Sequence, residues 1–208
     1  MDRRKKKIYC LIIILAVLIL GLFFIPYSIS LKEKNLQLGG ESKIFDFGND
    51  VGEKKVFLQF SDNRGKLYVK KNFYSYCYIS LSGFEQSAVV NQLSIGHDQL
   101  KIIEVSGYVG AHSENRQYFY LDSNLCPKAI TFEKEGELSY NIFSDEPNFI
   151  LQDDDGLINL IVEFRNWDTD PISETIRDRY FFESEKQKFI FAGSENFSYL
   201  NVLPDDNN

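Results

Sequence analysis

The sequence begins with an unbroken apolar run and then changes to short segments in which apolar and polar residues alternate. Residues 8–25 carry no charge, and as a helix rising 1.5 Å per residue they span roughly 27 Å, close to the thickness of a bilayer core. A helix also satisfies its own backbone hydrogen bonds, which lipid cannot do. The pattern therefore predicts one transmembrane helix over residues 8–25, in contact with membrane lipid.

Charge on either side of this run predicts its orientation. Residues 1–7 hold five basic residues and one acid, whereas residues 8–208 carry a net charge of −11. Basic residues stay on the cytoplasmic side of such helices, so we expect a cytoplasmic tail at 1–7 and an extracytoplasmic domain after the helix. A second interpretation stays open, because Ser28-Ile29-Ser30 has the spacing of a signal-peptide cleavage site. Cleavage near Ser30 would release the rest of the chain as a secreted protein.

Alternation with a period of two dominates the rest of the chain and predicts a mainly β fold. After a polar stalk at 26–42, we expect a β-domain at 43–203 and a disordered tail at 204–208, with one short helix at 86–93. The spacing of the strands is typical of an antiparallel meander, arranged as a propeller-like fold, a sandwich or a barrel. The predicted strands are residues 55–60, 66–70, 73–81, 101–105, 117–121, 129–133, 138–142, 149–151, 157–164, 179–183 and 188–192.

Composition adds aromatic strand faces and excludes one class of partner. Aromatic residues make up 15% of the chain, and large rings pack well on a pleated surface. Tyr74, Tyr76 and Tyr78 alternate along one predicted strand, and Tyr118 and Tyr120 along another, so each set shares a face. Such a face belongs either to the core or to a surface that binds sugars or a protein. The acidic charge of the domain argues against nucleic-acid binding.

Three cysteines agree with an oxidising location. Cys10 lies in the apolar run, which leaves Cys77 and Cys126 as a pair in the β-domain. In an oxidising compartment these two either form a disulfide or remain as two buried free thiols that behave as small apolar residues. The sequence leaves both possibilities open.

One loop has the residue types of a cation site. In Leu151–Leu160, LQDDDGLINL, oxygen-bearing side chains recur at alternate positions around a glycine. The stretch resembles the calcium loops of FG-GAP or VCBS-type repeats, which are blades of extracellular β-propellers. That resemblance implies Asp153, Asp155 and Asn159 as calcium ligands, although Leu151 occupies the first ligand position and has no side-chain oxygen. A plain hairpin turn, in which Asp side chains cap backbone amides, explains the same residues.

The chain contains no recognised catalytic motif. Nucleophile-elbow, zinc-protease, P-loop and CxxC patterns are all absent from the sequence. We therefore predict a membrane-anchored, extracytoplasmic binding protein of the cell envelope, without catalytic activity, whose partner is another envelope protein. Two alternatives remain: an envelope hydrolase whose carboxylates no motif reveals, or an inhibitor or immunity-type protein acting on an extracytoplasmic enzyme.

Overall fold

A computed structural model shows a mainly β protein preceded by two helical segments. A helix covers residues 11–21, in which the side chains of 11–20 are exposed, and a short helix covers residues 32–36. Within the described part of the chain, neither helix combines the length and the apolar character that a membrane crossing requires. The structure describes residues 11–21, 32–36, 40–48, 50–61, 64–84, 88–95, 100–109, 113–144, 149–154, 157–165 and 174–198.

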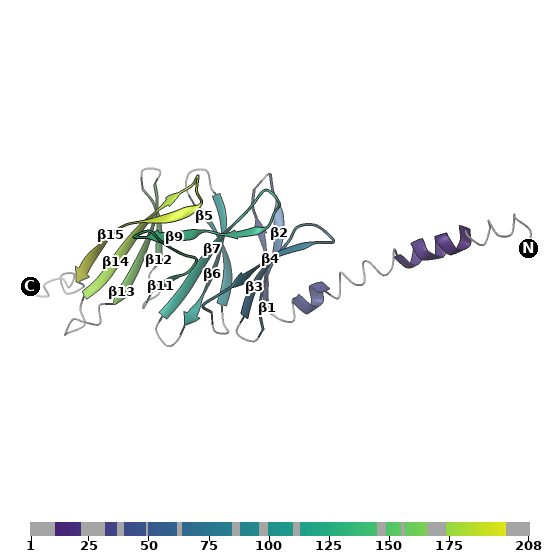
Figure 1. The fold of residues 1–208 in the computed structure, drawn as a ribbon, viewed down its shortest axis with the longest axis horizontal. Coiled ribbons are helices and arrows are strands. Elements are labelled where there is room, and N and C mark those ends of the chain that lie inside the picture. The colour runs from purple at the N-terminus through teal and green to yellow at the C-terminus, as the bar shows by residue number, and fades with distance from the viewer. Residues whose placement is uncertain are drawn as a thin grey trace, which may run out of the picture.

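The strands of these residues form three open sheets, which we call sheets A, B and C (Figure 1). Sheet A is a meander of β1 (Gly40–Asp46), β2 (Glu53–Ser61), β3 (Arg64–Lys70) and β4 (Tyr76–Leu81). Sheet B has the order β11-β7-β6-β5, with β8 paired to β7; its strands are β5 (Ala88–Ile95), β6 (Leu100–Val109), β7 (Ser113–Leu121), β8 (Pro127–Ala129) and β11 (Ile142–Ser144). Sheet C has the order β10-β9-β15-β14-β13-β12; its strands are β9 (Thr131–Lys134), β10 (Glu137–Ser139), β12 (Phe149–Asp154), β13 (Leu157–Arg165), β14 (Glu174–Glu183) and β15 (Lys188–Ser198).

The sheets are stacked as three layers with sheet B in the middle (Figure 1). Successive residues of a strand point to opposite faces, and both faces of β6 are covered. Ile103 and Val105 therefore pack with residues of sheet A, whereas Ile102 packs with residues of sheet C. This explains why β6 is buried along most of its length, as strands between two layers are.

The two interlayer cores differ in composition. Aliphatic residues such as Val56, Leu58 and Val69 predominate in the core between sheets A and B, which also contains Phe45, Phe84 and Phe119. The core between sheets B and C is aromatic, and the rings of Phe132 and Phe189 stack there with centroids 5.3 Å apart. Aromatic pairs of this kind stabilise a core by about 0.5–1.5 kcal/mol beyond the area they bury.

Side chains rather than strand pairing join sheets A and B along one edge. Strand β5 is the edge strand of sheet B, and it contacts β1 of sheet A. The Lys43 ammonium donates to the Val90 carbonyl oxygen at 2.7 Å, and the Val90 N–H donates to the Glu41 carboxylate at 3.2 Å. An unpaired strand edge is a template for aggregation, and here two charged side chains occupy it.

The short helix 32–36 lies on the outer face of sheet A. Leu36 is buried, and Phe57, which lies on the outer face of β2, is fully buried as well. Glu33 contacts two lysines of the sheet, with its carboxylate oxygens 2.6 Å from Lys55 Nζ and 2.7 Å from Lys70 Nζ. These two hydrogen bonds lower the pKa of Glu33 below its ordinary value.

The strand predictions are largely confirmed, and four expectations are corrected. The hairpins at 131–139, 149–165 and 174–198 are present. The helix expected at 86–93 is wrong, because β5 begins at Ala88 and pairs along its whole length with β6. Strand β1 begins at Gly40, within the segment expected to be a stalk.

The meander is also not purely antiparallel. Strand β9 pairs in parallel with β15, and no propeller ring or barrel closes among the strands that the structure describes. Of the three architectures expected, the layered sheets are nearest to a sandwich. Both ends of the predicted transmembrane segment (residues 8–10 and 22–25), the cleavage site at 28–30 and the tail at 204–208 lie outside the described residues.

Candidate functional site

A cleft of about 530 Å³ lies where sheet A meets sheet B. Strand β4 forms one wall, and β7 and β8 form the other, since β4 lies beside β8. The residues that line it come from four separate stretches of the chain: Ile79, Ser80, Ser82, Gln117, Phe119, Tyr120, Lys128, Ala129, Thr131 and Tyr140.

A disulfide fixes the two walls of this cleft relative to each other. Cys77 of β4 is bonded to Cys126, which precedes β8, with Cα atoms 5.2 Å apart. This resolves the alternative that the sequence left open in favour of the disulfide. The turn that carries Cys126 is held by Asp122, whose carboxylate accepts the N–H groups of Asn124 and Cys126, both at 2.9 Å. The backbone hydrogen bond from Cys126 is the main reason that the pKa of Asp122 is lowered.

A group of hydrogen bonds made by Asn115, Gln117 and Asn141, which we call the polar brace, lies at one end of the cleft. Asn115 Nδ2 donates to the carbonyl oxygen of Gly83 at 2.8 Å and to Asn141 Oδ1 at 3.1 Å. Gln117 Nε2 donates to the carbonyl oxygen of Ser82 at 2.7 Å and also to Asn141 Oδ1. Gly83 has a φ of 73°, and a Cβ there would approach Asn115 Nδ2 to 2.9 Å, so the brace requires glycine. Tyr140, which precedes Asn141 in the chain, also lines the cleft.

The chemistry of the lining is suited to binding. Phe119 is buried and Tyr120 half-buried, while Tyr140 is 59% exposed at the rim and the side chain of Lys128 is 56% exposed. Pockets of 300–1,000 Å³ with aromatic walls and a few polar groups are typical ligand sites. Hydroxyl groups of Ser80, Ser82 and Thr131 add hydrogen-bonding capacity.

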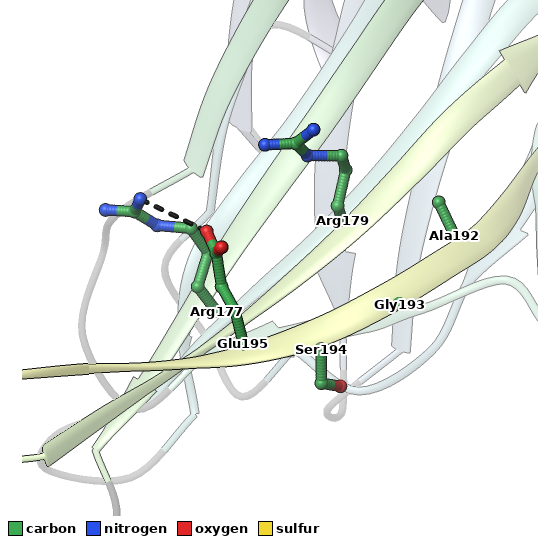
Figure 2. A pocket seen from close by; sticks show the side chains of 6 residues that line it. All are labelled: Arg177, Arg179, Ala192, Gly193, Ser194 and Glu195. Carbon is green, nitrogen blue, oxygen red and sulfur yellow. Dashed lines mark hydrogen bonds and ion pairs between the residues drawn. The ribbon is translucent and has the colours of Figure 1, made fainter.

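A second, smaller hollow of about 210 Å³ lies on sheet C, over a bulge in β15 (Figure 2). The register between β14 and β15 shifts beyond Arg179, and Ala192 is the extra residue of β15. Gly193 faces Arg179 across the ladder, and an added Cβ on Gly193 would meet open space. Figure 2 shows the guanidinium groups of Arg177 and Arg179 projecting beside this point, with Ser194 on the opposite side.

The two arginines of this hollow differ in their partners. Arg177 Nη2 lies 2.6 Å from Glu163 Oε1 and its Nη1 lies 3.4 Å from Glu195 Oε1. The Glu163 hydrogen bond is the main reason that the pKa of Arg177 is raised. Arg179 is exposed and forms no ion pair within the described part of the chain. The charge of Arg177 is largely balanced by Glu163 and Glu195. The hollow therefore offers the single guanidinium of Arg179 to an anionic group.

Carboxylates also occur inside the molecule, in a network between sheets B and C. Arg116 lies 2.9 Å from Glu104 and 3.2 Å from Glu114, and both carboxylates are buried. Tyr118 lies next to them, and burial, followed by the charge of Glu104, raises its pKa above the ordinary value. Neither hollow described above is lined by these carboxylates. We therefore assign this network a structural role.

The residues of the predicted cation loop occupy a hairpin. Asp153 is in β12 opposite Ile158, and Asn159 is in β13 opposite Gln152. Asp155 falls outside the described residues. The described part of the chain contains no group of three or more His, Cys, Asp or Glu side chains arranged to hold a metal. Calcium binding by Asp153, Asp155 and Asn159 stays a prediction.

The tyrosine faces have two different fates. Tyr118 is 2% exposed and belongs to the core between sheets B and C, whereas Tyr78 is 59% exposed on the outer face of sheet A. Tyr120 lines the cleft. The sequence pattern marked Tyr120 as a candidate for binding. It did not mark Gln117, Lys128 or Tyr140, because alternation identifies these three only as polar positions of strands or turns.

Fold and site together define a layered β protein with a ligand-sized cleft and an exposed apolar helix at its N-terminal side. No protein-family model, curated protein or solved structure matches the chain.

Proposed function

We propose that this chain is a membrane-anchored binding protein of the cell envelope, without catalytic activity. Residues 8–25 anchor it in the membrane, and the β-domain on the extracytoplasmic side binds a protein partner through the cleft between sheets A and B. The observation that carries the proposal is the cleft itself, because it combines aromatic walls, hydroxyl groups and one lysine in a volume suited to a bound peptide segment.

The construction of the cleft supports a preformed binding site. Its walls are fixed by the Cys77–Cys126 bond, and its end is fixed by the brace of Asn115, Gln117 and Asn141. A site that is ordered before binding loses less entropy when its partner arrives. Tyr140 at the rim has the character of a binding hot spot, since tyrosines contribute more binding energy than most interface residues.

The exposure of the N-terminal helix supports the anchor. The side chains of residues 11–20, apolar in all positions, are exposed to their surroundings, and Leu11 is 70% exposed. Apolar surface of this extent is unfavourable in water and favourable in hydrocarbon. The basic residues at 3–7 favour a cytoplasmic N-terminus.

Topology is tested with reporter domains fused after residue 208 in the full chain. We expect a reporter that is active only outside the cytoplasm to give signal, and one that is active only in the cytoplasm to give none. The reverse pattern would refute the proposed topology. Loss of residues 8–25 from the mature protein, measured by intact mass, would show that the chain is secreted rather than anchored.

Binding by the cleft is tested with peptides selected from a display library against the full chain in detergent micelles. We expect Tyr140→Ala to weaken the selected peptides by about thirtyfold, the effect of losing a hot-spot side chain. Tyr108→Ala is the matched control, because Tyr108 is 54% exposed but lies outside the cleft lining. Equal effects of the two substitutions would place binding elsewhere and contradict the proposal.

A further inference from the structure

The surface of sheet A next to the N-terminal segment carries a group of residues that we call the lysine–aromatic patch. It consists of Lys32 on the short helix and of Lys70, Lys71, Phe73 and Tyr74 at the β3–β4 turn. Contacts of Lys70 connect the two parts. Its ammonium forms an ion pair with Glu33 of the short helix, and Lys70 Nζ lies 5.8 Å from the centre of the Phe73 ring. The patch therefore forms one continuous surface.

The aromatic residues of the patch are held outward by an ordered turn. Asn72 Oδ1 accepts the N–H groups of Tyr74 at 2.9 Å and Ser75 at 3.0 Å, and the Lys71 N–H donates to the Ser75 carbonyl oxygen at 3.0 Å. Even so, Phe73 is 56% exposed and Tyr74 is 67% exposed, with their rings edge to face at 5.1 Å. Two large rings fixed on a rigid turn in contact with water indicate a surface that is covered in use.

Charge is divided unevenly between this end of the molecule and the other. Residues 28–82, which include the short helix and sheet A, contain nine basic and six acidic residues, a net charge of +3. Residues 83–208 contain nine basic and 23 acidic residues, a net charge of −14. Near a negatively charged surface, this distribution turns sheet A toward it and the remaining layers away from it.

The length of the chain places the patch close to the proposed anchor. Lys32 follows Ile25 by seven positions, so the two are at most about 25 Å apart even when the chain between them is fully extended. Lysines together with Tyr or Phe are the residues that occupy the headgroup region of a membrane, where rings enter the interface and ammonium groups meet phosphate.

We propose that the lysine–aromatic patch docks on the surface of an anionic bilayer, with Phe73 and Tyr74 in the headgroup region. This inference rests on the proposed anchoring by residues 8–25. Docking orients the stack of sheets with sheet A on the membrane and sheet C farthest from it. Lys32 and Lys71 contribute to docking through their attraction to lipid phosphate, whereas Lys70 is paired with Glu33 and the rings contribute by burial of apolar surface.

The test uses the full chain in nanodiscs whose lipids carry brominated acyl chains, which quench nearby indoles. Trp167→Phe removes the single tryptophan of the sequence, and Phe73→Trp then reports on the patch. The matched control is Leu138→Trp, because Leu138 is 64% exposed but lies in β10 of sheet C. We expect quenching at position 73 and none at position 138, with stronger quenching in discs that contain phosphatidylglycerol than in discs of phosphatidylcholine alone.

Substitution of the lysines separates docking from mere proximity. We expect Lys32→Ser or Lys71→Ser to lower the ratio of docked to undocked protein about fivefold in anionic discs, and high salt to act in the same direction. Equal quenching at positions 73 and 138 in a chain that resists extraction by alkaline carbonate would overturn docking while leaving the anchor intact. A chain that carbonate releases from vesicles would overturn the anchor, and the docking inference with it.

Discussion

Lys43 Nζ lies 2.7 Å from the carbonyl oxygen of Val90, so a side chain of sheet A occupies the free edge of a strand in sheet B. The Val90 N–H is occupied in the same way by Glu41, and Val90 itself is fully buried. The two layers are therefore joined by hydrogen bonds as well as by their apolar core. Several stability measurements follow from contacts of this kind.

The first prediction concerns this edge. Lys43→Met removes the donor to a buried carbonyl group, and we expect it to lower the free energy of unfolding by about 1–3 kcal/mol. Freeing the β5 edge should also increase self-association, because an unpaired strand edge recruits another. Urea unfolding and light scattering of the full chain in micelles measure both effects. Lys186→Met, at an exposed lysine with a surface ion pair, should leave stability nearly unchanged.

The second prediction concerns pH and the short helix 32–36. Because Lys55 and Lys70 lower the pKa of Glu33, the ionised carboxylate is favoured in the folded state. Its contribution is complete above its ordinary value near 4.5 and is lost as pH falls through the lower, folded-state value. The protection factors of the helix amides, which are exchange rates corrected for the intrinsic effect of pH, should therefore fall below pH 4.5 in the wild type. In Glu33→Gln the protection should be low at every pH, whereas the exposed Glu135→Gln should behave as wild type.

The third prediction concerns the disulfide. Cys77 and Cys126 are separated by 49 positions, and closing a loop of this size stabilises a fold by about 2–4 kcal/mol. The Cys77→Ser/Cys126→Ser double variant should unfold at correspondingly lower urea concentration. Mass spectrometry after maleimide labelling of the unfolded, unreduced chain should show one labelled cysteine, Cys10. Three labelled cysteines would mean that the bond does not form.

The fourth prediction concerns the buried charge network. Arg116→Met would leave Glu104 and Glu114 buried near each other without their shared cation, which costs about 3–5 kcal/mol. Arg179→Met makes the same chemical change at an exposed arginine, and we expect it to alter stability by about 0.5 kcal/mol or less. Equal effects would show that the network does not contribute as the distances indicate. Thermal or urea unfolding of both variants decides between these outcomes.

The fifth prediction concerns calcium. If Asp153, Asp155 and Asn159 bind the ion, titration with millimolar calcium should release or absorb heat and raise the melting temperature of the full chain. Asp155→Asn should reduce both signals. The absence of heat and of any rise in melting temperature would leave the plain hairpin turn as the explanation of LQDDDGLINL.

Alternation predicts strands well here because most strands have one buried and one exposed face. The exception is instructive, since residues 86–93 were expected to be helical. Strand β5 has Val90 and Ile95 in two different cores, and its polar residues at 91 and 92 contact the neighbouring sheet. Its burial therefore does not follow a simple period of two, and the pattern resembles a short amphipathic helix.

Layer order and the site were not predictable from the pattern. The assignment of Ile102 and Ile103 to opposite cores depends on which sheet covers each face, and sequence periodicity carries no such information. The cleft depends on long-range contacts, above all the disulfide and the hydrogen bonds from Asn115 and Gln117 to residues of two distant turns. Composition could mark Cys77 and Cys126 as a candidate pair, but not the wall that their bond positions.

The central place of β15 in sheet C has a consequence for biosynthesis. Strand β15 follows every other strand of this sheet in the chain, yet it lies between β9 and β14. During synthesis, sheets A and B can assemble before β15, the neighbour of the β9–β10 hairpin, is available. Assembly of the third layer is thus delayed until residues 188–198 emerge, and a chain that stops before them would carry an exposed hairpin that folding chaperones can recognise.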